Sequence, residues 1–330
     1  MYKISFIIVN YKSWTPLKEC LDSIVSLKGN ANFEYEVIII DNKSNDNKLE
    51  SFASLYPGYN FIENEGNYGF SNGNNLGARY ATGDYLLFLN PDTIVSEKPL
   101  NYLLNFANNN PEYSIYSLQQ KRPSGSNEYP FNSFPSFWTV NSILKSLYEH
   151  LSGSKLKKKC DRDEVIYPDW VSGSFVFIRK NIFHEIGGWD EDFWLYSEDT
   201  DLCKRARDKA GPVALLCRQN IIHKHAGSTR SNTAISAFFK AHVHISKHIY
   251  FSKHYKGINN FLIQLFFMFN AMLLEKLIPA MAGLIFFPVA KLRKYPFIYI
   301  YLLKYYINSL IKGSWLIDIK NIKIPGENNG

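Results

Sequence analysis

Cysteine is scarce in this sequence. The 330 residues include only four cysteines, with no close pair and no zinc-like spacing: Cys20, Cys160, Cys203 and Cys217. This pattern argues against a small disulfide-stapled scaffold and against a cysteine-based zinc centre. We expect all four to be thiols in a reducing compartment.

Charge is also sparse. Charged residues make up 20% of the chain, the formal net charge is +7, and aromatic residues reach 16%. Nucleic-acid-binding proteins usually carry dense, clustered basic residues, so we expect no nucleic-acid partner. A basic chain rich in aromatic side chains better fits an anionic membrane surface or a phosphate-bearing substrate.

Two N-terminal signals are missing as well. The apolar run 4–9 follows a single lysine and is too short for the hydrophobic segment of a secretory signal, so we expect the active part of the chain in the cytoplasm. No Gly-x-Gly-x-x-Gly sequence follows this run, which argues against a dinucleotide-binding domain.

Apolar runs of strand length alternate with helical segments over the first 115 residues. Run 85–89 has no polar alternation, as expected of a strand that is covered on both faces. Similar runs occupy 4–9, 37–40 and, more weakly, 59–62. Helical spacing begins at about Thr15, and a second helix is expected to continue from the glycine-rich segment 66–77. This alternation predicts an α/β fold with a doubly wound, mainly parallel sheet.

Polar residues follow three of these strands at the same relative position. They are Asn10, Asp41 and Asn90, the last with Asp92 two residues on. In a parallel sheet these ends share one rim, where ligands of α/β proteins bind, although ordinary turn chemistry also favours Asn and Asp. The backbone of segment 66–77 could bind a phosphate, or its glycines could simply allow tight turns.

Acidic and aromatic residues are dense between positions 189 and 201. Glu198 and Asp199 could be first-turn residues of a helix capped by Ser197, or carboxylates tuned as a base in an aromatic-walled pocket. His223 and His225 follow at strand spacing, which predicts one face of a strand. They are structural residues or ligands.

The C-terminal region is hydrophobic and helical. Apolar stretches 258–274 and 277–290 are separated by Glu275 and Lys276, and each is short of the roughly 20 residues that span a membrane. With their flanking Lys, Arg and Tyr residues, we expect helices that lie in the interface of an anionic membrane. The alternative is a helical subdomain packed on the catalytic domain or on a second subunit of a homo-oligomer.

Together, these motifs resemble the inverting nucleotide-sugar glycosyltransferases of family 2, which have the GT-A fold, and in particular the rhamnosyltransferase-like branch. The motifs occur in the family's order: Ile7–Tyr11, Ile39–Ser44, Asn67–Gly77, Phe88–Thr93, Gly187–Glu191 and Tyr196–Leu202. The resemblance implies a catalytic domain over 1–232, with a nucleotide-binding half (1–115) and an acceptor half (116–232). A membrane-associating helical region would occupy 233–330.

The resemblance also implies roles for individual residues. Asp199 would be the general base, with Glu198 beside it, and Asp92 would bind a divalent cation, Mg²⁺ or Mn²⁺, completed by His223 or His225. The donor nucleotide sugar would lie against a set of strand-end and helix-start residues: Val9, Asn10, Tyr11, Asp41, Asn67, Gly69, Asn74, Asn75 and Asn90.

Two positions depart from the family pattern. The broad family has Asp-x-Asp where this chain has Asn90-Pro91-Asp92, the form usual in the rhamnosyltransferase-like branch, and Asn74 stands where many members have arginine. Each change removes one charge from the expected donor site.

The expected reaction transfers L-rhamnose from dTDP-rhamnose to a lipid-linked saccharide in bacterial surface polysaccharide synthesis. The enzyme would lie peripherally on the inner face of the cell membrane. A UDP-hexose or UDP-N-acetylhexosamine donor is one alternative, and a catalytically silent membrane scaffold is another. A glycosidase would need two carboxylates flanking the bond, and the acidic residues are numerous enough to leave that possibility open.

Overall fold

The computed structural model describes residues 1–29, 32–151, 156–225, 232–286 and 289–326. The chain forms two compact units, each assembled from three segments. The first unit comprises Met1–Phe134, Lys155–Glu191 and Glu198–Ser228. The second comprises Pro135–Ser154, Asp192–Ser197 and Thr229–Gly330.

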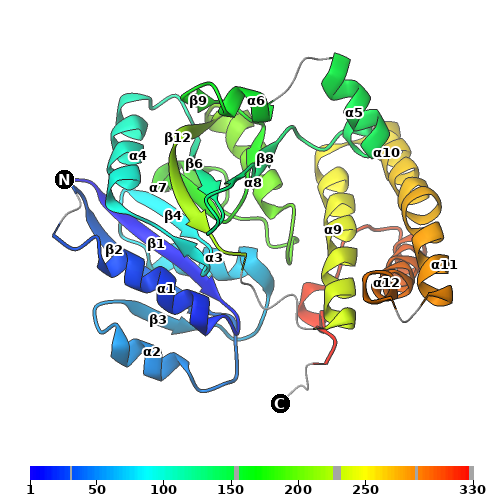
Figure 1. Cartoon of the computed structure of the whole chain (residues 1–330), viewed down its shortest axis with the longest axis horizontal. Coiled ribbons are helices and arrows are strands. Elements are labelled where there is room, and N and C mark those ends of the chain that lie inside the picture. Colours follow the sequence, from blue (N-terminus) through cyan, green and yellow to red (C-terminus); the bar gives the residue numbers. More distant parts are fainter. Residues whose placement is uncertain (30–31, 152–155, 226–231, 287–288, 327–330) are drawn as a thin grey trace. The chain divides into compact units, whose positions relative to one another are not determined.

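The first unit is built on one mixed sheet with the strand order β3-β2-β1-β4-β11-β6-β12-β5 (Figure 1). Its four leading strands are parallel to one another, and β11 is antiparallel to β4 and β6. This arrangement confirms the expected mainly parallel α/β fold. The strands are β1 (Lys3–Asn10), β2 (Glu34–Asp41), β3 (Asn60–Glu63), β4 (Tyr85–Leu89), β5 (Thr93–Ile94), β6 (Ile115–Lys121), β11 (Phe175–Arg179) and β12 (Val213–His223), with β7 (Asn127–Glu128) and β9 (Val165–Ile166) at its margins.

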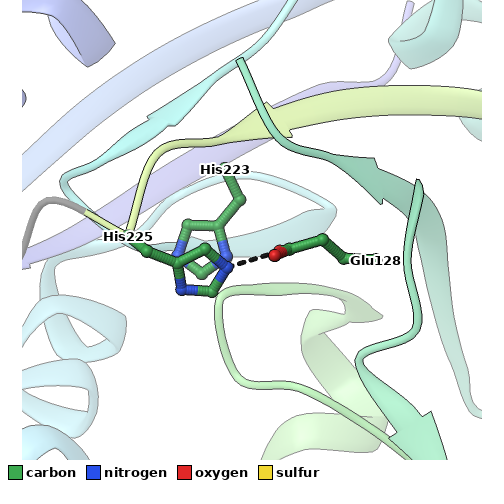
Figure 2. A group of neighbouring side chains, drawn as sticks. All are labelled: Glu128, His223 and His225. Carbon is green, nitrogen blue, oxygen red and sulfur yellow. Dashed lines mark hydrogen bonds and ion pairs between the residues drawn. The ribbon is translucent and has the colours of Figure 1, made fainter. Parts of the chain in front are cut away.

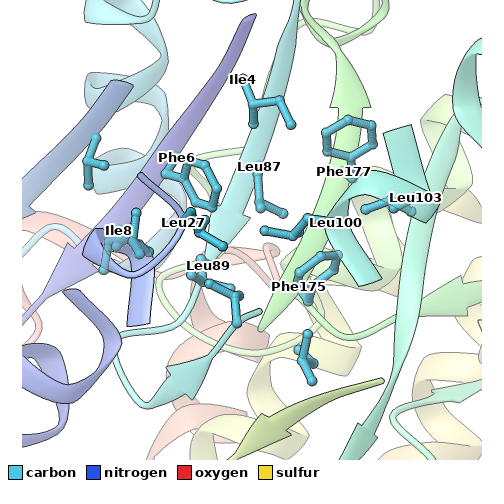
Figure 3. Close-up of a cluster of buried hydrophobic side chains, with 14 of the residues drawn as sticks. Ile4, Phe6, Ile8, Leu27, Leu87, Leu89, Leu100, Leu103, Phe175 and Phe177 are labelled. Carbon is cyan, nitrogen blue, oxygen red and sulfur yellow. The ribbon is translucent and has the colours of Figure 1, made fainter. Parts of the chain in front are cut away.

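Helices cover both faces of this sheet. They are α1 (Trp14–Val25), α2 (Leu49–Leu55), α3 (Gly69–Tyr80), α4 (Glu97–Asn109), α6 (Leu156–Cys160), α7 (Lys180–Glu185) and α8 (Glu198–Ala210). Alternate side chains of β1, β4 and β11 pack with Leu100 and Leu103 of α4 on one face (Figure 3). Ile7 and Val9 of β1 face the other cluster, which includes residues of α3, α7 and α8. Because both faces are buried, the strands lack polar alternation.

Two glycines let α3 approach the sheet closely. A Cβ on Gly77 would lie 2.5 Å from Ile7 Cγ2, and one on Gly73 would lie 2.9 Å from Asn42 Oδ1 and the Val9 methyl groups. Close helix–sheet packing, which is neither phosphate binding nor a tight turn, therefore accounts for these two glycines.

The expectation of four free thiols is wrong for two of them. Cys160 and Cys217 form a disulfide, whereas Cys20 and Cys203 are free and buried. The pairing of β12 with β9 places Cys217 against Glu164, through a 2.7 Å hydrogen bond from its N–H, and so beside α6. A separation of 57 residues hides this proximity in the sequence. The cysteines therefore no longer support a reducing compartment.

The second unit is helical. It contains α5 (Ser142–Leu151), α9 (Thr233–His254), α10 (Gly257–Phe269), a π-helical turn (Asn270–Lys276), α11 (Leu277–Ile285) and α12 (Ala290–Lys312). The helical stretch Gly257–Ile285 has 29 residues and contains an 18-residue window with a mean hydropathy of 1.7, so by length and composition it could cross a membrane. It runs through Glu275 and Lys276 as a π-helical turn. One such helix is weak support for a span, because core helices of soluble proteins pass the same test.

Candidate active site

A buried carboxylate lies at the rim formed by β1 and β2. Asn10 and Asp41 are direct register partners, and Asn10 Nδ2 donates a 2.7 Å hydrogen bond to Asp41 Oδ1. Ser44 donates from its N–H and hydroxyl to the same carboxylate, at 2.8 and 2.6 Å. Burial raises the pKa of Asp41, and these hydrogen bonds oppose that rise. The carboxylate is therefore held in one orientation.

A chain of amides joins this rim to the start of α3. Asn42 Nδ2 donates to the carbonyl of Gly69 at 2.9 Å, and Asn64 Nδ2 donates to the side-chain oxygens of Asn42 (3.0 Å) and Asn72 (2.9 Å). Sequence reasoning assigned no role to Asn42, Asn64 or Asn72. The available signal was that Asn42 and Asn64 directly follow the ends of β2 and β3.

Other residues expected to bind the donor lie on the same rim. Val9 is the next-to-last residue of β1, and Tyr11 follows the strand with the ammonium of Lys12 above its ring, 5.0 Å from the centroid. Asn67 and Gly69 lie at the start of α3, where Gly69 has a φ of +92°. That backbone conformation favours glycine and sets the direction in which α3 leaves the rim.

Asn74 and Asn75 are adjacent in α3 but have different surroundings. Asn74 Nδ2 donates to the carbonyl of Phe70 at 3.0 Å, while its buried Oδ1 has no hydrogen-bond partner in the described protein. The amide of Asn75 instead bonds both backbone groups of Trp189 (2.8 and 2.9 Å) and Glu191 Oε1 (2.8 Å). Asn75 thus uses its polar atoms to link α3 to segment 187–191.

Asp92 follows β4 and is buried beside a histidine. Its Oδ1 lies 3.2 Å from His223 Nε2, and the side chain is 9% exposed. Antiparallel pairing of His223 with Thr93 creates this contact, and Lys224 N–H donates to the Asp92 carbonyl at 3.0 Å. The other ring nitrogen of His223 lies 2.9 Å from Gln120 Oε1. Two strands therefore fix the imidazole against the carboxylate.

Glu128 lies beside the pair formed by His223 and His225 (Figure 2). The ring centroids of His223 and His225 lie 4.0 Å apart, and His225 Nε2 is hydrogen-bonded to Glu128 Oε2. His225 lies two residues beyond the end of β12 and has a φ of +52°, so the second histidine is not part of the strand. Burial raises the pKa of Glu128, but hydrogen bonds from His225 and Arg122 outweigh burial and lower it.

This cluster is a candidate metal site. One ligand atom each from Glu128, His223 and His225 lies within 4.8 Å of the others, and Asp92 adjoins His223. Carboxylate and imidazole donors fit a divalent cation. Sequence reasoning missed Glu128 because it lies on the two-residue strand β7, in a stretch rich in Ser, Pro and Asn.

Glu198, which is buried, and Asp199, which is half-buried, begin α8 as an acidic pair. Asp199 accepts hydrogen bonds from Gly173 N–H (3.1 Å) and Thr200 N–H (2.7 Å), whereas Glu198 Oε2 is buried without a partner in the described protein. Burial raises the pKa of Asp199; burial and the charge of Asp199 raise that of Glu198 further. Ser197 has a φ of +62°, unlike the extended backbone of an N-cap residue.

A small-residue turn connects the two parts of the site. Gly173, whose N–H binds Asp199, precedes Ser174, whose carbonyl accepts a 3.1 Å hydrogen bond from Asn90 N–H. Gln120 Nε2 donates to the Ser174 hydroxyl at 2.7 Å, and its amide oxygen faces the buried histidine. The base candidate Asp199, the strand-end residue Asn90 and the histidine cluster are thus all connected to this short segment. Sequence reasoning assigned no role to this turn.

Comparison with known proteins gives one family. The family described as "Glycosyl transferase family 2" matches residues 5–187. Among curated relatives, rhamnosyltransferase WbbL of Escherichia coli is 28% identical over 211 residues, which cover 61% of this chain and 76% of that protein. The N-acetylglucosaminyl-diphospho-decaprenol L-rhamnosyltransferase of Mycobacterium tuberculosis is 25% identical over 242 residues, covering 67% of this chain and 76% of that protein.

Solved structures agree on the fold. GalNAc-T7 with UDP, GalNAc and Mn²⁺ aligns with a TM-score of 0.53 and 15% identity, over 70% of this chain and 45% of that chain. This chain therefore spans less than half of that protein, and the likeness concerns the fold alone.

Proposed function

This chain belongs to glycosyl transferase family 2, and we propose that it transfers a sugar with inversion, best assigned as L-rhamnose from dTDP-rhamnose, to a lipid-linked saccharide. Two of its relatives are rhamnosyltransferases, and one of them is named for a diphospho-decaprenol acceptor. The product would belong to bacterial surface polysaccharide synthesis. The observation that carries the proposal is the half-buried carboxylate of Asp199, joined through Gly173 and Ser174 to the rim that holds Asn90.

Asp199 is the proposed general base. Inversion requires one displacement, in which the acceptor hydroxyl oxygen attacks the anomeric carbon while the nucleotide diphosphate leaves from the opposite side. The base takes the hydroxyl proton, so no second catalytic carboxylate is needed. Burial makes Asp199 a stronger base than an exposed aspartate, and the N–H groups of Gly173 and Thr200 orient it.

The residues present fit a divalent cation. Asp92, Glu128, His223 and His225 would hold it, and when bound it would supply positive charge to the diphosphate leaving group. Asn90 cannot supply a second carboxylate to the cation. The two histidines would supply nitrogen ligands instead. Because imidazole is a poor ligand for Mg²⁺, Mn²⁺ fits this set better of the two ions.

The rim at the ends of β1 and β2 is the proposed nucleotide site. Asn10 and Tyr11 would contact the base and ribose, beside the fixed carboxylate of Asp41. The amide chain from Asn42 to α3 supports this surface from behind. A UDP-hexose or UDP-N-acetylhexosamine donor remains the alternative, and thermal-shift measurements with each nucleotide sugar distinguish the donors by the size of the stabilisation.

The proposed location is the inner face of the cell membrane. Within the second unit, large apolar side chains of α10 and α11 are exposed, including Phe261 (61%), Ile278 (70%) and Leu284 (68%). Exposed apolar surface of this extent is typical of membrane contact.

Replacing the base tests the mechanism. We expect Asp199→Asn to lower the rate of transfer by at least about a thousandfold, since the acceptor proton loses its base, while nucleotide binding stays unchanged. The measurement is turnover of dTDP-rhamnose with a lipid-linked acceptor, together with titration of dTDP. Asp208→Asn, at an exposed position of the same helix, is the matched control. Wild-type turnover in Asp199→Asn would refute the base assignment.

A further inference from the structure

The disulfide between Cys160 and Cys217 is joined to the candidate cation site through strand β12. Cys217 precedes His223 by six residues, and both belong to this strand. The pairing of β12 with β6 skips residues 217–219, which form a bulge. The disulfide therefore ties the bulge of β12 to Cys160, the last residue of α6.

This bulge sets the register of the part of β12 that carries the histidine. Directly beyond the bulge, Asn220 pairs with Gln119 of β6, and His223 then pairs with Thr93 of β5. Successive side chains of a strand point to opposite faces, so a slip of one residue would turn the imidazole to the other face of the sheet. A cross-link at the bulge thus restrains the position of one proposed cation ligand.

A second connection runs from the disulfide to Glu128. Cys160 Sγ lies 3.6 Å from Gln119 Oε1, and Gln119 Nε2 donates a 2.8 Å hydrogen bond to the carbonyl of Glu128. Gln119 is buried, so water does not readily replace these contacts. A disulfide sulfur has no hydrogen to donate, whereas the thiol formed by reduction can donate one to the Gln119 oxygen. The oxidation state of Cys160 therefore bears on a second proposed ligand.

The disulfide is open to a reductant on one side. Cys160 is buried, but Cys217 is half-buried and is followed by the exposed Arg218. The two free cysteines, Cys20 and Cys203, are fully buried. At the inner face of the membrane, the location proposed above, disulfides are rare and are usually transient or redox-sensing.

We propose that the Cys160–Cys217 disulfide is a redox-sensitive switch of the cation site. When formed, it holds Glu128 and His223 in place for a divalent cation, and its reduction loosens both ligands. In that step a dithiol supplies two electrons and two protons, the S–S bond breaks, two thiols form, and the dithiol itself becomes a disulfide. The inference rests on the cation site of the proposed function, but not on the identity of the sugar or of the acceptor.

Binding of Mn²⁺ to the full chain in its oxidised and reduced states tests this switch. The protein is reduced with dithiothreitol, freed of reductant by desalting under argon and titrated with Mn²⁺ alone, and electron paramagnetic resonance reports the free ion. We expect the Kd for Mn²⁺ to rise by about tenfold or more on reduction, as it does when other groups that orient metal ligands are lost. Reoxidation with oxidised glutathione should restore the original Kd.

Three variants separate the switch from a purely structural cross-link. Cys160→Ser combined with Cys217→Ser should bind Mn²⁺ as the reduced wild type does, with or without reductant. Gln119→Leu, which keeps the disulfide, should weaken binding by the oxidised protein and diminish the change on reduction. Cys203→Ala, at a buried cysteine outside the disulfide, is the matched control and should keep the wild-type difference.

Equal Mn²⁺ affinity of the oxidised and reduced wild type would overturn the switch, even if reduction lowers the melting temperature, because a purely structural cross-link predicts that result. A response to reductant in the double serine variant would overturn it as well. The wild type needs no substitution, so a variant that fails to fold does not prevent the test. Redox-dependent Mn²⁺ binding without sugar transfer would reject the proposed function and keep the switch, whereas transfer with redox-independent Mn²⁺ binding would reject the switch and keep the function.

Discussion

The carboxylates of the candidate site differ in the groups that hydrogen-bond to them or lie against them. Asp41 accepts hydrogen bonds from Asn10 and Ser44, and Asp92 lies against an imidazole. Asp199 has two backbone donors, whereas the adjacent Glu198 has an oxygen with no partner in the described protein. Neighbouring groups with differently shifted pKa values are typical of sites that divide acid and base roles. This difference agrees with the proposal that Asp199 is the general base.

Glu198 makes the fold sensitive to pH. Its pKa is well above the ordinary value in the folded protein, so the folded state binds the proton more tightly than the unfolded state. Its contribution to stability is therefore greatest at low pH and decreases as pH rises beyond the ordinary carboxyl range. We expect Glu198→Gln, which cannot ionise, to raise the melting temperature at pH 7.5. The rise should be roughly 2–4 °C for each kcal/mol that the substitution adds to the free energy of unfolding, and no rise is expected at pH 4.

Thermal unfolding of both proteins at the two pH values measures this effect. Glu112→Gln, at an exposed position of the same unit, is the control and should shift neither midpoint. A lower melting temperature of Glu198→Gln at pH 7.5 would show that the buried carboxylate is not a cost to folding.

Glu128 gives a second prediction at this scale. If the cluster holds a cation, Glu128→Gln and His225→Ala each remove one ligand, and the Mn²⁺ concentration for half-maximal activity should rise by about tenfold or more. Titration of chelator-treated enzyme with Mn²⁺ measures the change. Glu63→Gln, at a surface ion pair with Lys43, is the control. An unchanged Mn²⁺ requirement in both variants would mean that the cation binds elsewhere.

Among the elements, α3 and β11 contribute most to the site. The start of α3 joins the amide chain of the rim, and its later turns press glycines against β1. Strand β11 runs antiparallel between β4 and β6, so its first residues lie at the same rim as the carboxyl end of β4. Because β11 runs in this direction, Gly173 and Ser174 lie at the candidate active site. The direction of β11 could not be inferred from a sequence pattern that predicts parallel strands.

The close approach of α3 can be tested with one methyl group. Gly77→Ala places a Cβ 2.5 Å from Ile7 Cγ2, so we expect a loss of roughly 1–3 kcal/mol of stability despite the higher helix propensity of alanine. Chemical denaturation measures it. Adding Ile7→Ala should recover part of the loss, giving less than the sum of the single changes. Gly58→Ala, where a Cβ meets nothing within 4 Å, is the control; an equal loss there would exclude the clash as the cause.

The two units differ in their exposed apolar surface and in their charge. The first has two apolar clusters enclosed by helices, whereas the second leaves much apolar surface exposed and carries most of the excess positive charge. A water-exposed surface of this kind is costly unless another apolar phase covers it. The proposed membrane contact by the second unit would account for both its charge and its exposed side chains.

Vesicle binding tests this division. Ile278→Glu combined with Leu284→Glu should reduce co-sedimentation with phosphatidylglycerol vesicles by about tenfold or more, because charged side chains oppose burial in the interface. Raised salt should weaken the remaining binding. Val25→Glu, an exposed apolar position of the first unit, is the control. Equal binding by the double variant would place the membrane contact on another surface.

The sequence by itself determined the class of fold, the family and the residues at the strand ends. Runs buried on both faces require a covered, mainly parallel sheet, and a parallel sheet collects its strand ends on one rim, so Asn10, Asp41 and Asp92 could be read directly from the order of the motifs. These inferences depend on residues that are close together in the sequence, and they follow from the pattern of apolar and polar residues.

Only the tertiary structure decided which distant groups meet. Glu128 beside His225, Gly173 beside Asp199 and Cys160 beside Cys217 are separated by 97, 26 and 57 residues. Strand pairing, the reversal at β11 and the left-handed backbone at His225 create these contacts, and none leaves a periodic signal in the chain. Side-chain burial, which raises the pKa values of Glu198 and Asp199, likewise follows from packing around them and not from their position in the sequence.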